Sequence, residues 1–408
     1  MTTISGGIND STTQIVSQAG EVKVGLLGWK NDCGLYGSTF KAIAITNPTT
    51  IVYDRGRGLS TDGACPGPQD YQMDGDTRPQ PMDSGVARPR RLRRGELVRG
   101  AVQDVHMNFQ DIVLPVFVSE TASAKPVASM PGISQLPVAD AVRMVRSLAG
   151  RGLRQFILFG VTPPNKKDAG GSFAASPDAP VNRALSEIRH QGLEVVAFSD
   201  LCFCEYTDHG HCGVLIDGDR QWVVDNDATL ERMASVAVAQ AKAGSDLVAP
   251  SGMMDGQVAA IRHALDDAGF HQVGILAYSV KYASNLYGPF REAGEGGMKF
   301  GDRSGYQMDF RRRLEWRTEL ETDIAEGADM VMVKPAISYL DIIHQVRQAC
   351  SVPLVAFHVS GEFAMLHAAA DRGWIELKPA VLEQTYAIKR AGADLVISYF
   401  APQLLDWM

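Results

Sequence analysis

The 408-residue sequence lacks any long uncharged apolar run, and it has little cysteine for its length. No stretch approaches the roughly 18 apolar residues that a membrane-spanning helix needs, so no membrane association is expected. No basic segment followed by an apolar core stands at the N-terminus, which argues against a secretory signal. Acidic residues outnumber basic ones, 47 to 39, and the formal net charge of -8 argues against general nucleic-acid binding. We expect a cytoplasmic globular protein.

The six cysteines are too few to form a disulfide scaffold in a chain of this length. Cys202, Cys204 and Cys212 lie close together, whereas the other three are scattered. In a chain without an export signal, such clustering favours metal binding over disulfides. Three thiolates suit zinc and leave its fourth position open for water or substrate. A disulfide between two of them is the alternative, and His209 and His211 are candidates for a fourth ligand or for hydrogen-bonding partners of the ligands.

Residues 1–86 differ in composition from the rest of the chain. They are rich in Gly, Ser, Thr, Asp and Pro, and they contain no residue pattern to which we can assign chemistry. This composition leaves partial disorder and a small accessory lobe as alternatives. We therefore treat residues 1–86 as an N-terminal extension of unknown role.

From residue 111 onward, short apolar runs alternate with segments of helical periodicity. Continuous apolar runs are typical of parallel strands buried on both faces, and the segments 139–149, 228–243 and 381–390 have apolar residues at helical spacing. Eight strand–helix units over about 290 residues indicate an α/β fold, a (β/α)₈ TIM barrel. A doubly wound sheet is the alternative, but no glycine-rich phosphate-binding sequence follows the first strand. The predicted strands are 111–118, 155–161, 194–201, 246–250, 272–280, 329–333, 353–359 and 394–399.

Three of the helical segments end in a similar short sequence just before a strand. Gly244, Gly327 and Gly392 occupy the same position in these sequences, and an aspartate follows each glycine by two residues. Glycine at this position is typical of a helix C-terminal cap and of a tight turn into the next strand.

Reactive side chains stand at the ends of the predicted strands, where barrel enzymes place their active sites. Lys281 follows the fifth strand and Lys334 the sixth, so the stems of both side chains must be largely buried. Burial and repulsion between amines on neighbouring strands lower the pKa of a lysine and favour its neutral, nucleophilic form. Snorkelling of the amines to solvent is the alternative. Asp200 ends the third strand, and Ser360 and Tyr399 stand at the ends of the seventh and eighth.

A long glycine-rich connection follows the fifth strand, and we refer to residues 287–307 as the lid segment. It carries Arg291 and Arg303, and two cations on a lid suit the binding of an anionic substrate. An ordinary solvated loop with surface arginines is the alternative.

Several of these segments resemble 5-aminolevulinate dehydratase, also called porphobilinogen synthase. The resemblance extends from about residue 88 to the C-terminus and is carried by DLCFCEYTDHGHCG (200–213), YSVKYAS (278–284), YGPFR (287–291), MVKP (332–335), YLDI (339–342), VSGEFAM (359–365) and KRAGAD (389–394). It implies condensation of two 5-aminolevulinate molecules to porphobilinogen with loss of water, a step of tetrapyrrole (haem) biosynthesis. A class I aldolase, which needs only one imine-forming lysine, and a non-catalytic zinc-binding barrel scaffold are the alternatives.

The resemblance also implies roles for the residues singled out above. Lys334 and Lys281 would be the Schiff-base lysines, with Lys334 the principal one, and Asp200 would support proton transfer or amine binding. The three clustered cysteines would bind a catalytic zinc. Substrate binding would fall to Arg291, Arg303, Gln307, Tyr287, Ser360 and Tyr399.

An oligomeric assembly is implied as well. The family's N-terminal arm wraps a neighbouring subunit in a homo-octamer, and residues 87–110, which contain the basic run 88–94, fit such an arm; residues 111–408 would then be the catalytic barrel. Some bacterial members bind an allosteric magnesium, and Glu319 falls where that carboxylate would lie, although a solvated glutamate is the alternative. Gly252 and Gln257 depart from the family pattern, which usually has Asp and Arg there.

Overall fold

The computed structural model describes residues 13–17, 20–24, 87–217 and 222–408. The contacts divide the chain into two units, Met1–Arg88 and Pro89–Met408. In the first unit, the described residues are Ala87, Arg88 and the strands β1 (Thr13–Ser17) and β2 (Gly20–Val24), which pair antiparallel. The rest of the predicted extension lies outside the described residues.

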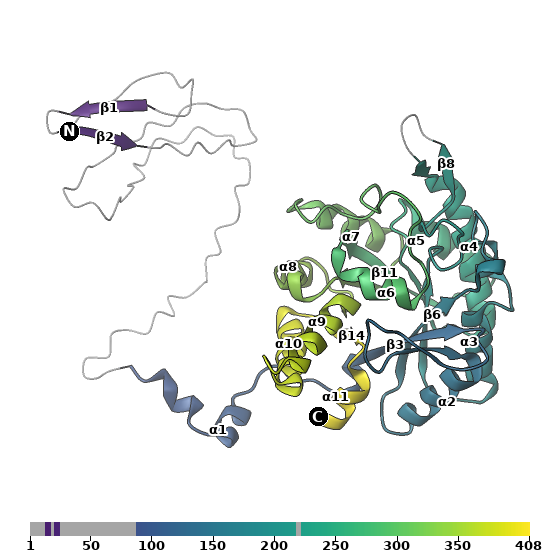
Figure 1. Cartoon of the computed structure of the whole chain (residues 1–408), viewed down its shortest axis with the longest axis horizontal. Coiled ribbons are helices and arrows are strands. Elements are labelled where there is room, and N and C mark those ends of the chain that lie inside the picture. The colour runs from purple at the N-terminus through teal and green to yellow at the C-terminus, as the bar shows by residue number, and fades with distance from the viewer. Residues whose placement is uncertain (1–12, 18–19, 25–86, 218–221) are drawn as a thin grey trace. The chain divides into compact units, whose positions relative to one another are not determined.

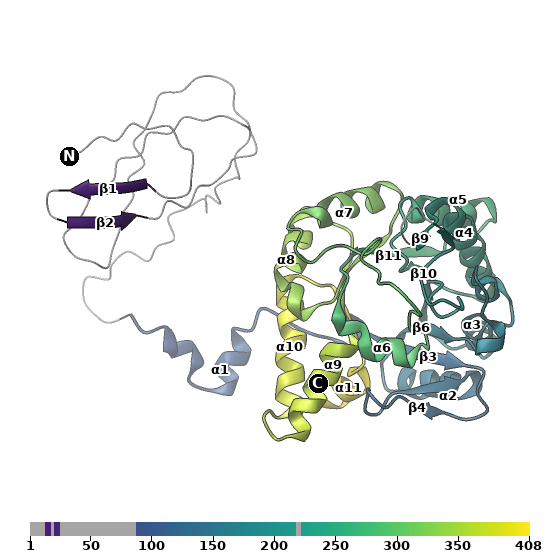
Figure 2. The same ribbon diagram turned by 45° about the horizontal axis from the view of Figure 1, so that its top comes forward.

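Within the described part of the second unit, eight parallel strands close into a barrel (Figures 1 and 2). They pair in the order β14, β13, β12, β11, β10, β7, β6, β3, and β14 pairs back with β3 to complete the ring. Every residue of β3 is buried, as expected for a strand with apolar side chains on both faces. Each predicted strand overlaps one of these eight, and the predicted barrel is confirmed. Their bounds are β3 (Ile112–Ser119), β6 (Gln155–Val161), β7 (Val196–Leu201), β10 (Leu247–Pro250), β11 (Gly274–Lys281), β12 (Met330–Lys334), β13 (Leu354–His358) and β14 (Leu395–Ser398).

Helices surround the ring of strands, as Figure 2 shows. In α2 (Val138–Ala149), the residues Ala141, Val142, Val145 and Leu148 recur at helical spacing and are buried, so this helix packs one apolar stripe toward the strands. The three segments with predicted helical spacing correspond to α2, α4 and α10. The other helices of the barrel are α3 (Pro180–His190), α4 (Asn226–Ala243), α5 (Gln257–Asp267), α6 (Gly288–Ala293), α7 (Glu315–Ala325), α8 (Leu340–Ala349), α9 (Ser360–Asp371), α10 (Leu377–Ala391) and α11 (Ala401–Trp407).

Two connections at the barrel carry additional strands. The connection after β3 contains β4 (Lys125–Pro126) and β5 (Ser134–Pro137), and β5 extends the sheet parallel to β3. The connection after β7 contains the antiparallel pair β8 (Leu215–Asp217) and β9 (Trp222–Val224). Among the described residues, no helix combines the length and the apolarity that a membrane span requires.

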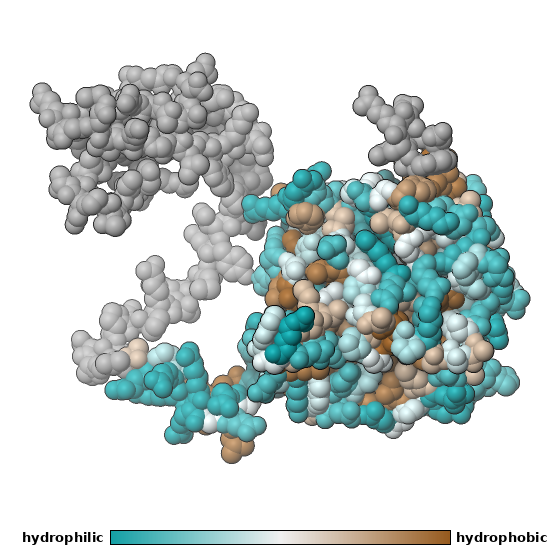
Figure 3. All heavy atoms as spheres, viewed as in Figure 1, coloured by the Kyte–Doolittle hydropathy of each residue, from teal (hydrophilic) through white to brown (hydrophobic). Residues whose placement is uncertain are grey.

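The predicted arm, residues 87–110, begins with the 3₁₀ helix η1 (Pro89–Arg93) and the helix α1 (Glu96–Ala101). Neither helix has a buried residue. The arm is largely hydrophilic in the space-filling view (Figure 3), yet Leu97 exposes 90% of its surface and Leu92 exposes 56%. Within the described residues, these two leucines therefore pack against no core, whereas Met107 near the end of the arm is buried in the core of the barrel.

The three repeated glycines end helices just before barrel strands, as the sequence predicts. Their φ angles are 105° at Gly244, 104° at Gly327 and 121° at Gly392. These positive angles are open to glycine at little cost, whereas a side chain with a Cβ is strained there. The glycine at each position is therefore required by the turn from helix to strand.

The aspartate that follows each glycine holds the neighbouring strand in register. The main-chain N–H of Asp394 donates to the carbonyl of Leu354 at 2.7 Å, and its Oδ2 accepts from the N–H of Leu354 at 2.7 Å. Asp246 makes the same pair of hydrogen bonds with β7, and Asp329 makes it with β11. The repeated sequence thus fixes the alignment of adjacent strands at three places around the barrel.

We expect Gly392→Ala to lower the free energy of unfolding by about 1–2 kcal/mol. The residue has a φ of 121°, and an added Cβ would lie 2.7 Å from Cβ of Arg347, so backbone strain and a side-chain clash add. Urea unfolding followed by circular dichroism measures the change. Gly150→Ala is the matched control, because Gly150 ends α2 with a φ of -63° and its added Cβ would meet only carbonyl oxygens at 3.5 Å or more. Equal losses in the two variants would contradict this account.

Candidate active site

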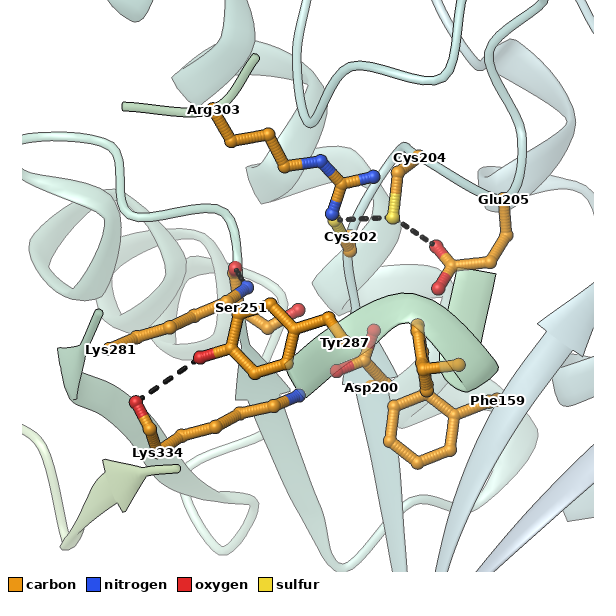
Figure 4. A pocket seen from close by; sticks show the side chains of 11 residues that line it. Phe159, Asp200, Cys202, Cys204, Glu205, Ser251, Lys281, Tyr287, Arg303 and Lys334 are labelled. Carbon is orange, nitrogen blue, oxygen red and sulfur yellow. Dashed lines mark hydrogen bonds between the residues drawn. The ribbon is translucent and has the colours of Figure 1, made fainter. Parts of the chain in front are cut away.

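A pocket lies at the C-terminal ends of the barrel strands, where the sequence predicts the active site (Figure 4). It contains both predicted lysines, the predicted aspartate, two of the clustered cysteines and one arginine of the lid segment. The residues that line it are Phe159, Asp200, Cys202, Cys204, Glu205, Ser251, Lys281, Tyr287, Phe290, Arg303 and Lys334.

Lys281 and Lys334 lie side by side in this pocket. Each is the last residue of its strand, and the two are partners in the parallel register of β11 and β12. Both are buried, with 4% and 5% of their surfaces exposed. Their Nζ atoms lie over the same ring, that of Tyr278, at 5.5 Å for Lys281 and 5.0 Å for Lys334. Figure 4 shows the two side chains extending in parallel across the pocket.

Aromatic rings enclose the amine of Lys334. Its Nζ lies 4.2 Å from the centroid of Phe357, and three further rings lie within 5.2 Å. Burial in this cage and, second to it, the charge of Lys281 lower the pKa of Lys334 to about 7, against the opposing charge of Asp200. A large fraction of the Lys334 amine is therefore neutral near pH 7, which is the form that attacks a carbonyl carbon.

Asp200 and Ser251 lie in the same pocket as the two lysines. Lys281 donates a hydrogen bond to the main-chain carbonyl of Ser251. Burial, followed by the charge of Glu205, raises the pKa of Asp200 to about 7, against the charges of both lysines and a hydrogen bond from Ser251. The Oδ1 atom of Asp200 is buried without a hydrogen-bond partner. A carboxyl group with this pKa can both accept and donate a proton near neutral pH.

The three clustered cysteines converge beside the lysines. Their Sγ atoms lie within 4.8 Å of one another, all three residues are buried, and none forms a disulfide. Cys202 donates to Sγ of Cys204 at 3.4 Å, and Cys204 donates to a carboxylate oxygen of Glu205 at 3.2 Å. Three sulfur donors in a dry cluster fit a zinc-type metal ion with one open position. Within the described residues, no other group of three or more His, Cys, Asp or Glu side chains brings its ligand atoms this close together.

Known proteins are similar to this chain over its arm and barrel. A family model described as delta-aminolevulinic acid dehydratase matches residues 86–407. Similar curated proteins are the delta-aminolevulinic acid dehydratases of Synechococcus elongatus (47% identity over 322 residues, 79% of this chain and 98% of that protein) and of Halalkalibacterium halodurans (45% over 328 residues, 80% and 98%). The chain belongs to the delta-aminolevulinic acid dehydratase family. It is accordingly an enzyme of the lyase class, a dehydratase.

The fold is also similar to that of a solved structure. The porphobilinogen synthase of Toxoplasma gondii ME49, in complex with the reaction product porphobilinogen, has a TM-score of 0.77 and 40% identity to this chain. The match covers 79% of this chain and 92% of that one.

The predicted carboxylate-binding residues of this dehydratase contain buried polar atoms without partners. A buried donor without a partner costs about 1–3 kcal/mol, so such atoms call for a ligand or water. Arg303 is partly satisfied, because its Nη2 donates to the carbonyls of Gly210 and Gly296, each at 3.0 Å. The atoms without partners are Nε of Arg291, Nε of Arg303, Nε2 of Gln307 and Oη of Tyr399.

Two other predicted substrate-binding residues hold the main chain of the lid segment and of β12. The Ser360 Oγ accepts a hydrogen bond from the N–H of Phe290 at 3.0 Å. The Tyr287 hydroxyl donates to the carbonyl of Tyr282 at 2.8 Å and also lies 3.2 Å from the carbonyl of Lys334. These residues therefore position the lid segment and the strand end that carries Lys334.

Glu319, by contrast, lies outside the pocket, on α7. Burial raises the pKa of its carboxyl group, and the nearby charges of Asp255, Glu315 and Glu326 raise it further. The described residues thus place Glu319 in an acidic cluster that is separate from the three cysteines.

Gly252, where the family usually has Asp, packs against a methionine from α4. An added Cβ would lie 2.4 Å from Cε of Met233 and 3.7 Å from Oε1 of Gln257. The Gln257 Oε1 also accepts a hydrogen bond from the N–H of Met254 at 3.3 Å. The two departures from the family pattern therefore lie close together, and Met233 fills the space that a side chain at 252 would take.

Sequence reasoning missed Ser251 and Glu205 as parts of the pocket. Ser251 follows the last residue of β10, so reading the end of the fourth strand in the same way as the others would have identified it. Glu205 lies inside the cysteine motif directly after Cys204, but the sequence has no feature that distinguishes its carboxylate from a solvated one.

Proposed function

We propose that this chain joins two molecules of 5-aminolevulinate into porphobilinogen with loss of water, with Lys334 and Lys281 as Schiff-base lysines. The observation that carries this proposal is the pair of buried lysines that share one pocket with the three-cysteine cluster. Membership of the dehydratase family supports it, as does the likeness to a porphobilinogen synthase with its product bound.

Each lysine would bind one keto group. The neutral amine attacks the carbonyl carbon, the resulting carbinolamine loses water, and an imine remains that draws electrons from the adjacent carbon and eases its deprotonation. Lys334 is the principal lysine in this proposal, because its pKa of about 7 makes the neutral amine available. Asp200, whose pKa is also about 7, is suited to move protons between substrate and solvent during these steps.

Cys202, Cys204 and Cys212 would hold a catalytic zinc. When bound, such an ion supplies Lewis acidity toward a substrate oxygen. The cysteines themselves fix the site beside the lysines, and their burial excludes competing water. His211 is not part of this ligand set, because both of its ring nitrogens have other partners.

The substrate carboxylates would be held on two sides of the pocket. Arg291 and Arg303, with Gln307 nearby, would bind one carboxylate by charge and hydrogen bonds. Ser360 and Tyr399 would bind the other. The buried donors that lack partners in four of these residues support this assignment.

Turnover distinguishes this proposal from its alternatives. The full chain, incubated with 5-aminolevulinate, zinc and a thiol reductant, is expected to release a pyrrole that reacts with an aldehyde dye reagent. An aldolase would cleave or join carbon chains without forming a pyrrole, and a scaffold would leave the substrate unchanged. Absence of the pyrrole under these conditions would reject the proposed function.

The rate of imine formation is expected to rise with pH and to level off above pH 7 to 8. The pKa of Lys334 is lowered to about 7, so the amine is mostly charged below this pH and mostly neutral above it. Reduction with borohydride at a series of pH values, followed by mass spectrometry of the labelled peptide, measures this profile. Labelling that still increases tenfold per pH unit between pH 8 and 10 would contradict the lowered pKa.

We also propose a homo-octamer in which residues 87–110 contact a neighbouring subunit. The exposed leucines on η1 and α1 support this assembly, because a second copy could cover them. Glu319 would contribute to an allosteric magnesium site, and the nearby carboxylates of Asp255, Glu315 and Glu326 are consistent with a hard cation. Location in the cytoplasm stays a prediction from the sequence.

A further inference from the structure

The cysteine loop, residues 202–213, is in direct main-chain contact with the lid segment. The N–H of Lys299 donates to the carbonyl of His209 at 3.1 Å, and Arg303 donates to the carbonyl of Gly210 at 3.0 Å. The two backbones approach so closely at Gly210 that an added Cβ would lie 2.3 Å from the carbonyl oxygen of Gly297. The lid segment therefore packs on the same loop that carries Cys212.

His211 uses both of its ring nitrogens to hold the lid segment. Its Nε2 lies 3.0 Å from the carbonyl oxygen of Phe300, and its Nδ1 lies 3.2 Å from the hydroxyl of Tyr306. A carbonyl oxygen only accepts, so Nε2 carries the proton and Nδ1 accepts from the Tyr306 hydroxyl. His211 is buried, and it directly precedes Cys212 in the sequence. His211 thus joins the chain next to Cys212 to two points of the lid segment.

The other residues of the lid segment link this contact to the substrate site. Tyr306 lies between Arg303 and Gln307, for which we propose substrate binding. Its N–H and that of Gln307 both donate to the carbonyl of Arg303, at 3.2 and 2.9 Å, so the three residues form one turn. A hydrogen bond that holds Tyr306 therefore also fixes the positions of its two neighbours.

We propose that His211 and Tyr306 are positioning residues that couple metal binding at the three cysteines to closure of the lid segment. The inference rests on the proposed function, because it requires a metal ion at that cluster. An ion bound by Cys202, Cys204 and Cys212 orders the cysteine loop, and His211 carries that order to Phe300 and Tyr306. Coupling between two binding events is reciprocal, so closure of the lid segment strengthens metal binding by the same factor.

Hydrogen exchange of the lid segment tests this coupling in the full chain. Exchange of peptides from residues 295–307 is measured in reduced, chelator-treated protein and again after addition of zinc alone. We expect zinc to slow this exchange about tenfold in the wild type, and less than about twofold in Tyr306→Phe and His211→Ala. His271→Ala is the matched control, because His271 is exposed and pairs with Asp266 away from the pocket; it should behave as the wild type does.

Zinc affinity and substrate kinetics provide two further measurements. Competition with a chelating dye should give a dissociation constant for zinc that is about 5- to 10-fold weaker in Tyr306→Phe, with one ion still bound per chain. The KM for 5-aminolevulinate should rise more than kcat falls, because closure of the lid segment rather than the reacting groups is affected. Tyr306→Phe removes only a hydroxyl, and an unchanged circular dichroism spectrum would show that the fold is retained.

The outcomes separate this inference from the proposed function. If the wild type binds zinc and forms the pyrrole but its lid exchange is the same with and without zinc, the coupling is wrong and the proposed function stands. Zinc protection in Tyr306→Phe and His211→Ala equal to that of the wild type would also overturn the coupling. A wild type that binds no zinc would instead refute the metal assignment itself.

Discussion

Lys334→Ala is expected to lower the rate of pyrrole formation by a factor of about 10⁴ or more, because it removes the nucleophile itself. The amine of Lys334 is enclosed by aromatic rings and lies beside Lys281, and its lowered pKa makes the neutral, nucleophilic form available. Covalent labelling by borohydride with 5-aminolevulinate should be lost at the peptide that contains residue 334. Mass spectrometry of the reduced protein measures this directly.

Two further variants separate the role of Lys334 from that of Lys281 and from a general effect of removing a lysine. Lys281→Ala should also abolish pyrrole formation but should leave labelling at Lys334, because each keto group needs its own amine. Lys378→Ala, an exposed lysine of α10, is the control and should keep both activity and labelling. Undiminished labelling of the Lys334→Ala protein would show that another lysine forms the principal imine.

Removal of the metal is expected to lower the rate about 10³-fold, since a Lewis acid contributes several kcal/mol to stabilising charge on a substrate oxygen. Treatment of the reduced protein with a chelator should produce this loss of rate, and added zinc should restore the rate. Cys204→Ser should stay inactive after zinc is added, because hydroxyl oxygen replaces one of three sulfur donors. Metal content measured by mass spectrometry should fall in parallel.

Cys350→Ser is the matched control for this experiment. Cys350 is a free cysteine at the end of α8 and lies outside the cluster of three. It should keep its zinc and its activity, which separates loss of a ligand from a general effect of thiol replacement. Full activity in metal-free Cys204→Ser protein would contradict a catalytic role for the metal.

The fold can be predicted from local features of the sequence. Apolar runs that end in polar residues, separated by helical periodicity, predict parallel strands and their boundaries to within a few residues. Because parallel barrel strands all end at one rim, the residues at strand ends must also converge. This is why Lys281, Lys334, Asp200 and the cysteines could be assigned to one site before their distances were available.

Contacts between distant loops are set by tertiary structure alone. Ser251 reaches Lys281 across 30 positions of sequence, and His211 reaches Tyr306 across 95. The path of a glycine-rich loop is not encoded by periodicity, since glycine permits many backbone conformations of similar energy. Packing against the barrel selects one of them.

The sequence by itself determined that this chain forms a barrel with two amines and three thiols at one rim. Strands that alternate with helices along the chain run parallel, so the residues at their C-terminal ends all lie at the same rim of the barrel. The tertiary structure decided the environment of those groups. The aromatic rings around Lys334 come from several segments, including β11, β13 and the lid segment, and only their packing excludes water enough to lower its pKa. The reactivity of a residue depends on its neighbours in space, and these neighbours are far apart in sequence.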